Sequence, residues 1–176
     1  DSNTETFVAI KFYLDNERWE DVPFYVRTGK KMKEKHSYIT IQFKPLPNST
    51  FSESTSLLSA NRLVINIQPQ MDIRLQFMSK KPGLSLALKP VEMIFDNFAC
   101  QTDTPEAYET LLLEALVGDL TLFMRSDQVE EAWDVIKTIQ ETWEKTKDPS
   151  FPNYASGNWG PDDSDALVER QGHQWV

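Results

Sequence analysis

Alternation of apolar and polar residues in the first half of the chain is the feature that most constrains its fold. The segments TFVAIKFYL, SYITIQF, RLVINIQ and MDIRLQFM each place an apolar side chain at every second position. Successive side chains of a β-strand point to opposite faces, so this pattern predicts strands with one apolar face. We therefore expect strands over 6–14, 22–27, 37–43, 62–68 and 71–78, followed by two short strands over 84–88 and 91–95.

In the second half of the chain the apolar spacing changes to three and four residues, which is typical of helices. Thr104-Pro105-Glu106 predicts a helix start, because a hydroxyl cap, a proline and an acidic residue follow one another, and Gly118 predicts its end. A second helix is predicted from Ser126 to about Lys147, and a last short helix between a capping Ser164 and Gly172. The apolar side chains of the second helix share one face and are expected to be buried: Val129, Ala132, Trp133, Ile136, Ile139 and Trp143.

Strands in succession followed by helices predict an α+β fold, a largely antiparallel sheet with helices packed on one face. Alternating rather than solidly apolar strands favour antiparallel pairing. The length of 176 residues suits one domain over 1–176. The other face of the sheet is mixed in character, so we expect it to remain in water or to meet a second subunit.

A cluster of positive charge interrupts an acidic chain. Residues 27–35 read RTGKKMKEK, with five cationic side chains and one glutamate, whereas the whole chain carries a formal charge of -9. One interpretation is a site for a small anion. The other is a solvated, lysine-rich turn, which charge alone favours. A nucleic acid is not expected as partner, because the remaining surface would repel a long polyanion.

Several kinds of site are not encoded in the sequence. It contains no G-x-G-x-x-G turn, no Walker lysine motif and no cluster of cysteines and histidines with metal-ligand spacing. His36 and His173 are the two histidines, one beside lysines and one near the C-terminus. The chain by itself therefore lacks the groups of a complete active site.

Cysteine usage and hydropathy indicate the surroundings of the protein. Cys100 is the single cysteine, so no internal disulfide can form, which suits a reducing compartment such as the cytoplasm. We expect Cys100 to be buried and inert. The apolar runs are too short to span a membrane. The start, DSNTETF, lacks a signal pattern, and we expect the chain to be a piece of a longer protein.

Long motifs in the chain resemble the C-terminal part of the glucose-6-phosphate dehydrogenase family. They are FVAIKFYLDNERWEDVPFYVRTGKKM, NRLVINIQP, PEAYETLLLEALVGDLTLFMRSDQVEEAW and YASGNWGP. The resemblance implies a role in oxidising glucose 6-phosphate to 6-phosphogluconolactone with NADP, in the pentose phosphate pathway. It also implies that NADP is bound mainly by a preceding dinucleotide-binding domain, and that the catalytic histidine precedes this chain too. Without that domain we expect the chain to be inactive.

The same resemblance assigns residues to substrate binding. In the family the lysine of the R-T-G-K loop contacts the sugar phosphate, which corresponds to Lys30, and a cation five residues later does so too, which corresponds to Lys35. The glutamine of the I-x-x-Q-P strand, here Gln68, neighbours the substrate in some members. No catalytic or metal-binding residue is expected in the chain.

Some members of the family hold a second, structural NADP in this domain. Arg27 matches that pattern, but positions that are basic in those members are polar or titratable here: His36, Thr40, Asn66 and Gln76. We therefore expect no nucleotide on this chain itself. An alternative of another class is a non-enzymatic module that forms a homodimer through a sheet face bearing Tyr13, Tyr38 and Met78.

Overall fold

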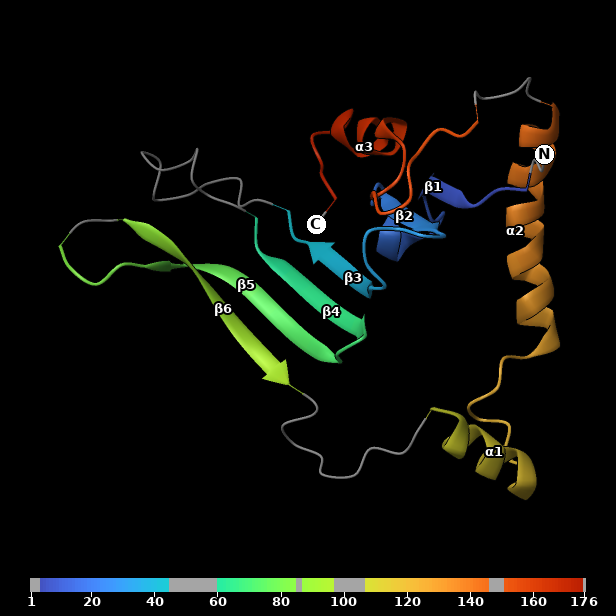
Figure 1. Ribbon diagram of the computed structural model, residues 1–176. Helices are drawn as coiled ribbons and strands as arrows, with labels where there is room; N and C mark the ends of the chain where they lie inside the picture. The colour runs from blue at the N-terminus through green and yellow to red at the C-terminus, as the bar shows by residue number, and fades with distance from the viewer. Residues whose placement is uncertain (1–3, 45–59, 85–86, 97–106, 146–150, 176) are drawn as a thin grey trace. The chain divides into compact units, whose positions relative to one another are not determined.

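The computed structural model describes residues 4–44, 60–84, 87–96, 107–145 and 151–175 (Figure 1). The chain divides into two compact units, one of Asp1–Cys100 with Tyr154–Val176 and the other of Gln101–Asn153. The described residues form antiparallel strands and α-helices, so the predicted α+β class is confirmed. Cys100 lies outside the described residues.

The strands of the first unit form two antiparallel sheets. A two-stranded sheet pairs β1 (Phe7–Phe12) with β2 (Phe24–Gly29). A four-stranded sheet has the order β3 (Ser37–Gln42), β4 (Arg62–Gln68), β5 (Asp72–Lys80) and β6 (Leu88–Asp96), as Figure 1 shows. The connection between β1 and β2 contains a 3-10 turn, η1 (Glu17–Trp19), where the Asn16 side chain accepts a hydrogen bond from the Trp19 N–H.

One strand prediction was wrong. The two short strands expected at 84–88 and 91–95 are replaced by the single strand β6, which continues through Pro90. Proline cannot donate to a ladder, but β6 is at the edge of its sheet and has one neighbour, β5. Pro90 lies opposite Met78 in that pair, and an edge strand tolerates a residue that has no N–H.

The alternation predicted from sequence does place the apolar residues of the four-stranded sheet on one face. Ile39 pairs with Ile65, which pairs with Ile73, and Ile73 pairs with Phe95. Directly paired residues lie on the same side of a sheet, so all four share a face. Several side chains of this face are exposed within the structure, for example Ile39 at 51% and Met93 at 61%.

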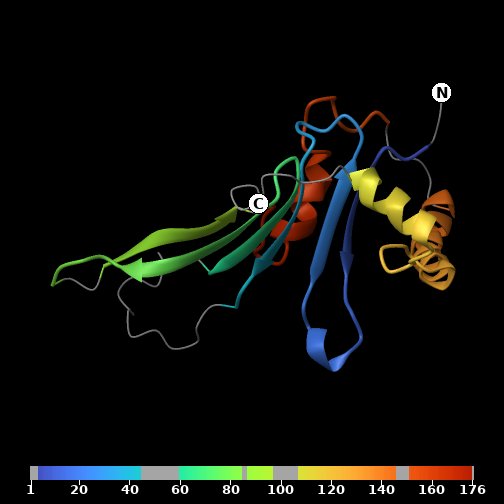
Figure 2. The same ribbon diagram turned by 90° about the horizontal axis from the view of Figure 1, so that it is seen from below.

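The C-terminal segment of the first unit packs on the β1–β2 hairpin. The last helix, α3 (Asp162–Glu169), lies beside the hairpin in both views (Figures 1 and 2). Val168 on α3 is 2% exposed and Ser164 is 5% exposed. The prediction of Ser164 as the cap was wrong: the cap position is Pro161, without a side-chain hydrogen bond, and the Ser164 carbonyl instead accepts a hydrogen bond from Trp175 Nε1 at 2.9 Å.

The second unit contains two helices. The first, α1 (Ala107–Val117), ends where Gly118 adopts a φ of +76°, as the sequence predicts. The second, α2 (Ser126–Lys145), begins at the predicted residue. Its apolar stripe is not buried as expected, since Trp133 is 61% and Trp143 39% exposed. The predicted helix start at 104–106 and the predicted end near residue 147 lie outside the described residues.

No helix in the described ranges combines the length and the apolar character that crossing a membrane requires.

Candidate anion-binding site

The basic segment lies at the end of the hairpin. Strand β2 ends at Gly29, and the connection to β3 begins with Lys30. The Lys30 N–H donates a hydrogen bond to the Thr6 carbonyl at 2.7 Å, which fixes the loop to the start of β1. The side chains of Lys30 and Lys35 are exposed, and among the described residues neither forms an ion pair. Their charges are therefore available to an anion.

The C-terminal motif YASGNWGP holds this loop through its main chain. The Gly157 N–H donates to the Lys31 carbonyl at 2.9 Å, and the Lys33 N–H donates to the Asn158 carbonyl at 3.1 Å. The Tyr154 hydroxyl lies 3.0 Å from the Lys30 carbonyl oxygen. Residues more than 100 positions apart in the sequence are thus joined along one short stretch, and the loop is not a free, solvated turn.

Two glycines make room for the ring of Phe7 beneath the loop. A Cβ atom on Gly29 would lie 2.8 Å from Phe7 Cδ2, and one on Gly160 would lie 2.4 Å from Phe7 Cε2 and Cζ. Gly160 also has a φ of +116°, which L side chains rarely adopt. The Phe7 ring packs against the ring of Tyr154 with centroids 5.5 Å apart. Gly160 is therefore required by the close approach of the motif to β1, and Gly29 by the Phe7 ring of the paired strand.

Gln68 lies at the other end of the loop. It is the last residue of β4 and pairs with Ser37, the first residue of β3, across a register shift between Ser37 and Tyr38. Lys35 is two residues before Ser37, so the structure brings Lys35 and Gln68 to one corner of the four-stranded sheet. Gln68 is exposed. Lys30 is the first residue of the connection between β2 and β3 and Lys35 is near its end, so all three predicted residues lie around a single connection.

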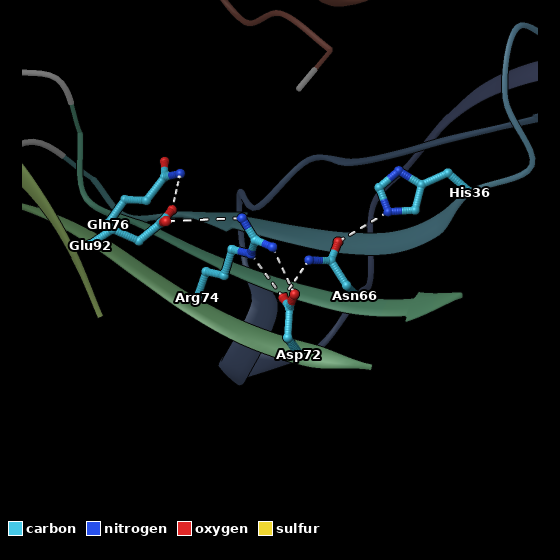
Figure 3. Close-up of polar contacts among 6 residues, drawn as sticks. All are labelled: His36, Asn66, Asp72, Arg74, Gln76 and Glu92. Atoms are coloured by element: carbon cyan, nitrogen blue, oxygen red, sulfur yellow. Dashed lines mark hydrogen bonds and ion pairs between the residues drawn. The ribbon is translucent and has the colours of Figure 1, made fainter. Parts of the chain in front are cut away.

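A network of polar side chains extends from this corner across the face of the sheet opposite the apolar one. It links His36, Asn66, Asp72, Arg74, Gln76 and Glu92 (Figure 3). Arg74 donates to both carboxylate oxygens of Asp72 at 3.0 and 2.8 Å, and Asn66 Nδ2 donates to Asp72 at 2.5 Å. Asn66 Oδ1 in turn lies 3.2 Å from His36 Nε2, which connects the network to the basic loop.

Asp72 is the buried member of this network, at 8% exposed. The hydrogen bonds from Arg74 lower the pKa of its carboxyl, and the hydrogen bond from Asn66 lowers this pKa further. Asp72 in turn raises the pKa of Arg74. Sequence reasoning did not single out this pair. The signal was present, because residues two apart on a strand share a face and the side chains of D-x-R carry opposite charge.

We expect Asp72→Asn to lower the free energy of unfolding by about 1–2 kcal/mol at pH 7, less than for a fully buried pair because Arg74 is partly exposed. Since folding lowers the pKa of Asp72, its contribution is complete above the unfolded pKa of about 3.9 and is lost as the pH falls through the folded pKa. The two proteins should therefore converge in acid. Urea titrations at several pH values measure this.

The matched control is Asp165→Asn, which removes an exposed carboxylate 3.9 Å from Arg27 and should change stability little. The prediction would be contradicted if the free energies of unfolding of Asp72→Asn and of the unmodified chain differed by the same amount from pH 7 to pH 2. The stabilisation would then not come from the charge of Asp72.

Arg27, the first cation of the basic segment, is not available to an anion as Lys30 and Lys35 are. Its side chain is 10% exposed, and its guanidinium lies 5.0 Å from the centre of the Trp159 ring and 4.6 Å from that of Trp175. Asp165 lies 3.9 Å away. The two cation–π contacts hold the C-terminal segment on β2.

Comparison with known proteins identifies the chain. All of its residues, 1–176, match the sequence family described as "Glucose-6-phosphate dehydrogenase, C-terminal domain". The chain belongs to this family. The family membership confirms the resemblance drawn from the motifs and places the Lys30 loop within a known dehydrogenase domain.

Individual relatives agree with the family. The glucose-6-phosphate 1-dehydrogenase of Chlamydia pneumoniae is 42% identical over 180 residues, and that of Bacillus subtilis is 44% identical over 176 residues; each covers 99% of this chain. The chain spans 35% and 36% of the length of these two relatives. The residues described here therefore correspond to about a third of those dehydrogenases.

Solved structures share the fold. A glucose-6-phosphate dehydrogenase determined in complex with its substrate glucose-6-phosphate matches with a TM-score of 0.83 and 32% identity, over 97% of this chain and 35% of that one. Glucose-6-phosphate 1-dehydrogenase from Mycobacterium avium matches with a TM-score of 0.81 and 30% identity, over 100% of this chain and 36% of that one.

Proposed function

We propose that this chain is the C-terminal, substrate-contacting domain of an NADP-dependent glucose-6-phosphate dehydrogenase, which converts glucose 6-phosphate to 6-phosphogluconolactone. The observation that carries the proposal is the loop from Lys30 to Lys35, whose cations are exposed and unpaired among the described residues while its main chain is fixed at Lys30, Lys31 and Lys33. A fixed loop with unpaired charges suits a small dianion better than a mobile lysine-rich turn does.

Each of the three site residues has a distinct part in this proposal. Lys30 and Lys35 donate charge-assisted hydrogen bonds to the phosphate oxygens, each contributing about 1.5–3 kcal/mol. Gln68 presents an amide at the same corner as Lys35 and hydrogen-bonds a sugar hydroxyl. These residues bind and orient the sugar phosphate. The oxidation transfers hydride from C1 of the sugar to NADP, and the base that removes the hydroxyl proton lies outside the 176 residues.

In this proposal the residues of this chain do not bind NADP, just as they do not include the catalytic base. The sequence has no glycine-rich phosphate turn, and the positions at which some relatives would hold a structural NADP carry a different arrangement. Arg27 is enclosed by two tryptophans, and Asn66 and Gln76 are bonded to the carboxylates of Asp72 and Glu92. Two carboxylates on this face would repel a nucleotide phosphate. We infer that these residues do not fit a second NADP.

The proposed function is tested by titrating the 176-residue chain with glucose 6-phosphate, with glucose as the control that lacks the phosphate. We expect weak, saturable binding of the phosphate ester only, which weakens as salt is raised. Addition of NADP together with the substrate should produce no NADPH. Equal binding of glucose and glucose 6-phosphate would contradict the phosphate site, and appreciable turnover would contradict the inactivity of the chain alone.

A second function, assembly into a homodimer through a sheet face in the cytoplasm, has support of its own. Both faces of the four-stranded sheet carry exposed apolar side chains, with Phe95 at 56% on the apolar face and Ile94 at 56% on the face of the polar network. Of the residues first suggested for that surface, Tyr38 and Met78 belong to this sheet, whereas Tyr13 follows β1 of the other. Concentration-dependent dimers without ligand binding would support this function alone.

A further inference from the structure

The hydroxyl of Tyr154, in the C-terminal motif, contacts both the basic loop and Thr6, the residue before strand β1. It is 3.0 Å from the Lys30 carbonyl oxygen and 3.1 Å from both the carbonyl oxygen and the hydroxyl of Thr6. The Lys30 N–H donates to that same Thr6 carbonyl at 2.7 Å. Both polar main-chain groups of Lys30 are therefore held, one by Thr6 and the other by Tyr154.

We propose that Tyr154 is a positioning residue for Lys30, acting on the main chain of the loop and not on the substrate. The proposal rests on the function proposed above and adds a residue to it. Neither charge nor the resemblance singled out Tyr154 in the sequence. The available signal was its place in the motif YASGNWGP, 124 residues after Lys30.

The chemistry of the phenol suits this role. A tyrosine hydroxyl has one hydrogen to donate and lone pairs to accept with. The Lys30 and Thr6 carbonyls can both only accept, and the phenol has a single hydrogen to give. Because the Thr6 carbonyl already accepts from the Lys30 N–H, we assign the phenol hydrogen to the Lys30 carbonyl, and the Thr6 hydroxyl can donate to the phenol in return. The Tyr154 ring is itself held against Phe7, with centroids 5.5 Å apart. The hydroxyl that donates to the loop therefore belongs to a ring that is held in place by Phe7 and not by the loop itself.

The loop needs such an anchor at this position. Lys31 has a φ of +51°, an uncommon backbone conformation for a lysine, so the chain turns sharply directly after Lys30. If the Lys30 carbonyl were released, the peptide between the two lysines could rotate and the direction of the Lys30 side chain would change. If a side chain becomes ordered only when the ligand binds, the entropy cost of ordering it reduces the net free energy of binding, and the affinity is lower.

The test is a double-mutant cycle on the 176-residue chain, with glucose 6-phosphate as the probe. Tyr154→Phe retains the ring and removes the hydroxyl. We expect it to weaken binding about 3- to 10-fold, the loss of one hydrogen bond. In a chain that already carries Lys30→Ala the same change should alter affinity by less than about 2-fold, because a residue that acts through Lys30 has nothing left to position.

The matched control is Tyr25→Phe. Tyr25 lies on β2 of the same hairpin, and its hydroxyl donates to Gln171, after α3, at 2.6 Å. Among the described residues this hydroxyl makes no hydrogen bond to the loop, so the change should leave the affinity unchanged. Amide hydrogen exchange gives a second readout: Tyr154→Phe should speed exchange at the Lys30 N–H more than Tyr25→Phe does. Both variants should unfold at similar urea concentrations.

The outcomes separate the two proposals. If Lys30→Ala itself leaves binding unchanged, the function proposed for the loop is wrong. If Lys30→Ala weakens binding but Tyr154→Phe does not, or weakens it equally with and without Lys30, the positioning role of Tyr154 is wrong while the substrate site stands.

Discussion

Replacement of Lys30 by alanine is expected to weaken binding of glucose 6-phosphate to this chain by about 10- to 150-fold. The estimate follows from a charge-assisted hydrogen bond of about 1.5–3 kcal/mol and the relation of affinity to free energy. The structure supports assigning this effect to the ammonium group, because the side chain is exposed and has no ion pair among the described residues, so nothing in the protein already neutralises it. Calorimetric titration at low ionic strength measures the loss.

Stability should not change in the same variant. The contacts that fix Lys30 are made by its N–H and its carbonyl, and alanine retains both. The midpoint of urea unfolding is therefore expected to stay within error of the unmodified chain. Lys30→Arg keeps the charge but changes the geometry of the donor, so it should recover part of the affinity.

The control for charge is Lys89→Ala. Lys89 is an exposed lysine on β6, opposite Ser79, and its loss changes the net charge of the chain by the same amount. If Lys89→Ala weakens binding as much as Lys30→Ala, the interaction is a general attraction of an anion to lysines, and the loop is not a specific site.

The four-stranded sheet shows how far the sequence alone predicts structure here. Alternation identified β4 over the residues that the structure shows and grouped Ile39, Ile65 and Ile73 on one face. These results follow because the side chains of a strand alternate between its two faces, so the period of two in the sequence shows which residues share the apolar face. The division of the strands into two sheets did not follow, since it depends on the connection between β2 and β3, whose fixed points are distant in sequence.

The residues of the candidate site could be selected from the sequence, but the contacts that hold their loop in place could not. The resemblance selected Lys30, Lys35 and Gln68, and the cations of residues 27–35 drew attention to the same loop because they stand out in an acidic chain. The support of the loop by Tyr154 was not visible. It depends on main-chain hydrogen bonds and on the ring of Phe7, and no local pattern reports which segment far along the chain will supply a partner.

Gly160→Ala is expected to have the largest effect on stability, lowering the free energy of unfolding by about 2–6 kcal/mol. Two costs combine. The φ of +116° is strained for any residue with a Cβ, at about 1–3 kcal/mol, and overpacking against the Phe7 ring costs about 1–3 kcal/mol. The nearest Phe7 atoms would be 2.4 Å away, a separation that real Cβ contacts do not show. Urea unfolding followed by tryptophan fluorescence measures the change.

Gly157→Ala separates the two costs. Gly157 also has a positive φ, +86°, but no atom lies within 4 Å of the position that its Cβ would take. It should therefore lose about 1–2 kcal/mol, the conformational cost alone. A second separation uses Phe7→Ala as the background, where Gly160→Ala should cost no more than Gly157→Ala does, because the ring it meets has been removed.

The same variant connects stability to binding. If Gly160→Ala displaces the C-terminal motif from β1, the hydrogen bonds from Gly157 to Lys31 and from Lys33 to Asn158 are lost with it, and hydrogen exchange at the Gly157 and Lys33 amides should rise together. Affinity for glucose 6-phosphate should then fall as well, although the substitution removes no charged group. Loss of stability with undiminished affinity would show that the loop keeps its shape without the motif, and would remove the structural reason for regarding it as a preformed site.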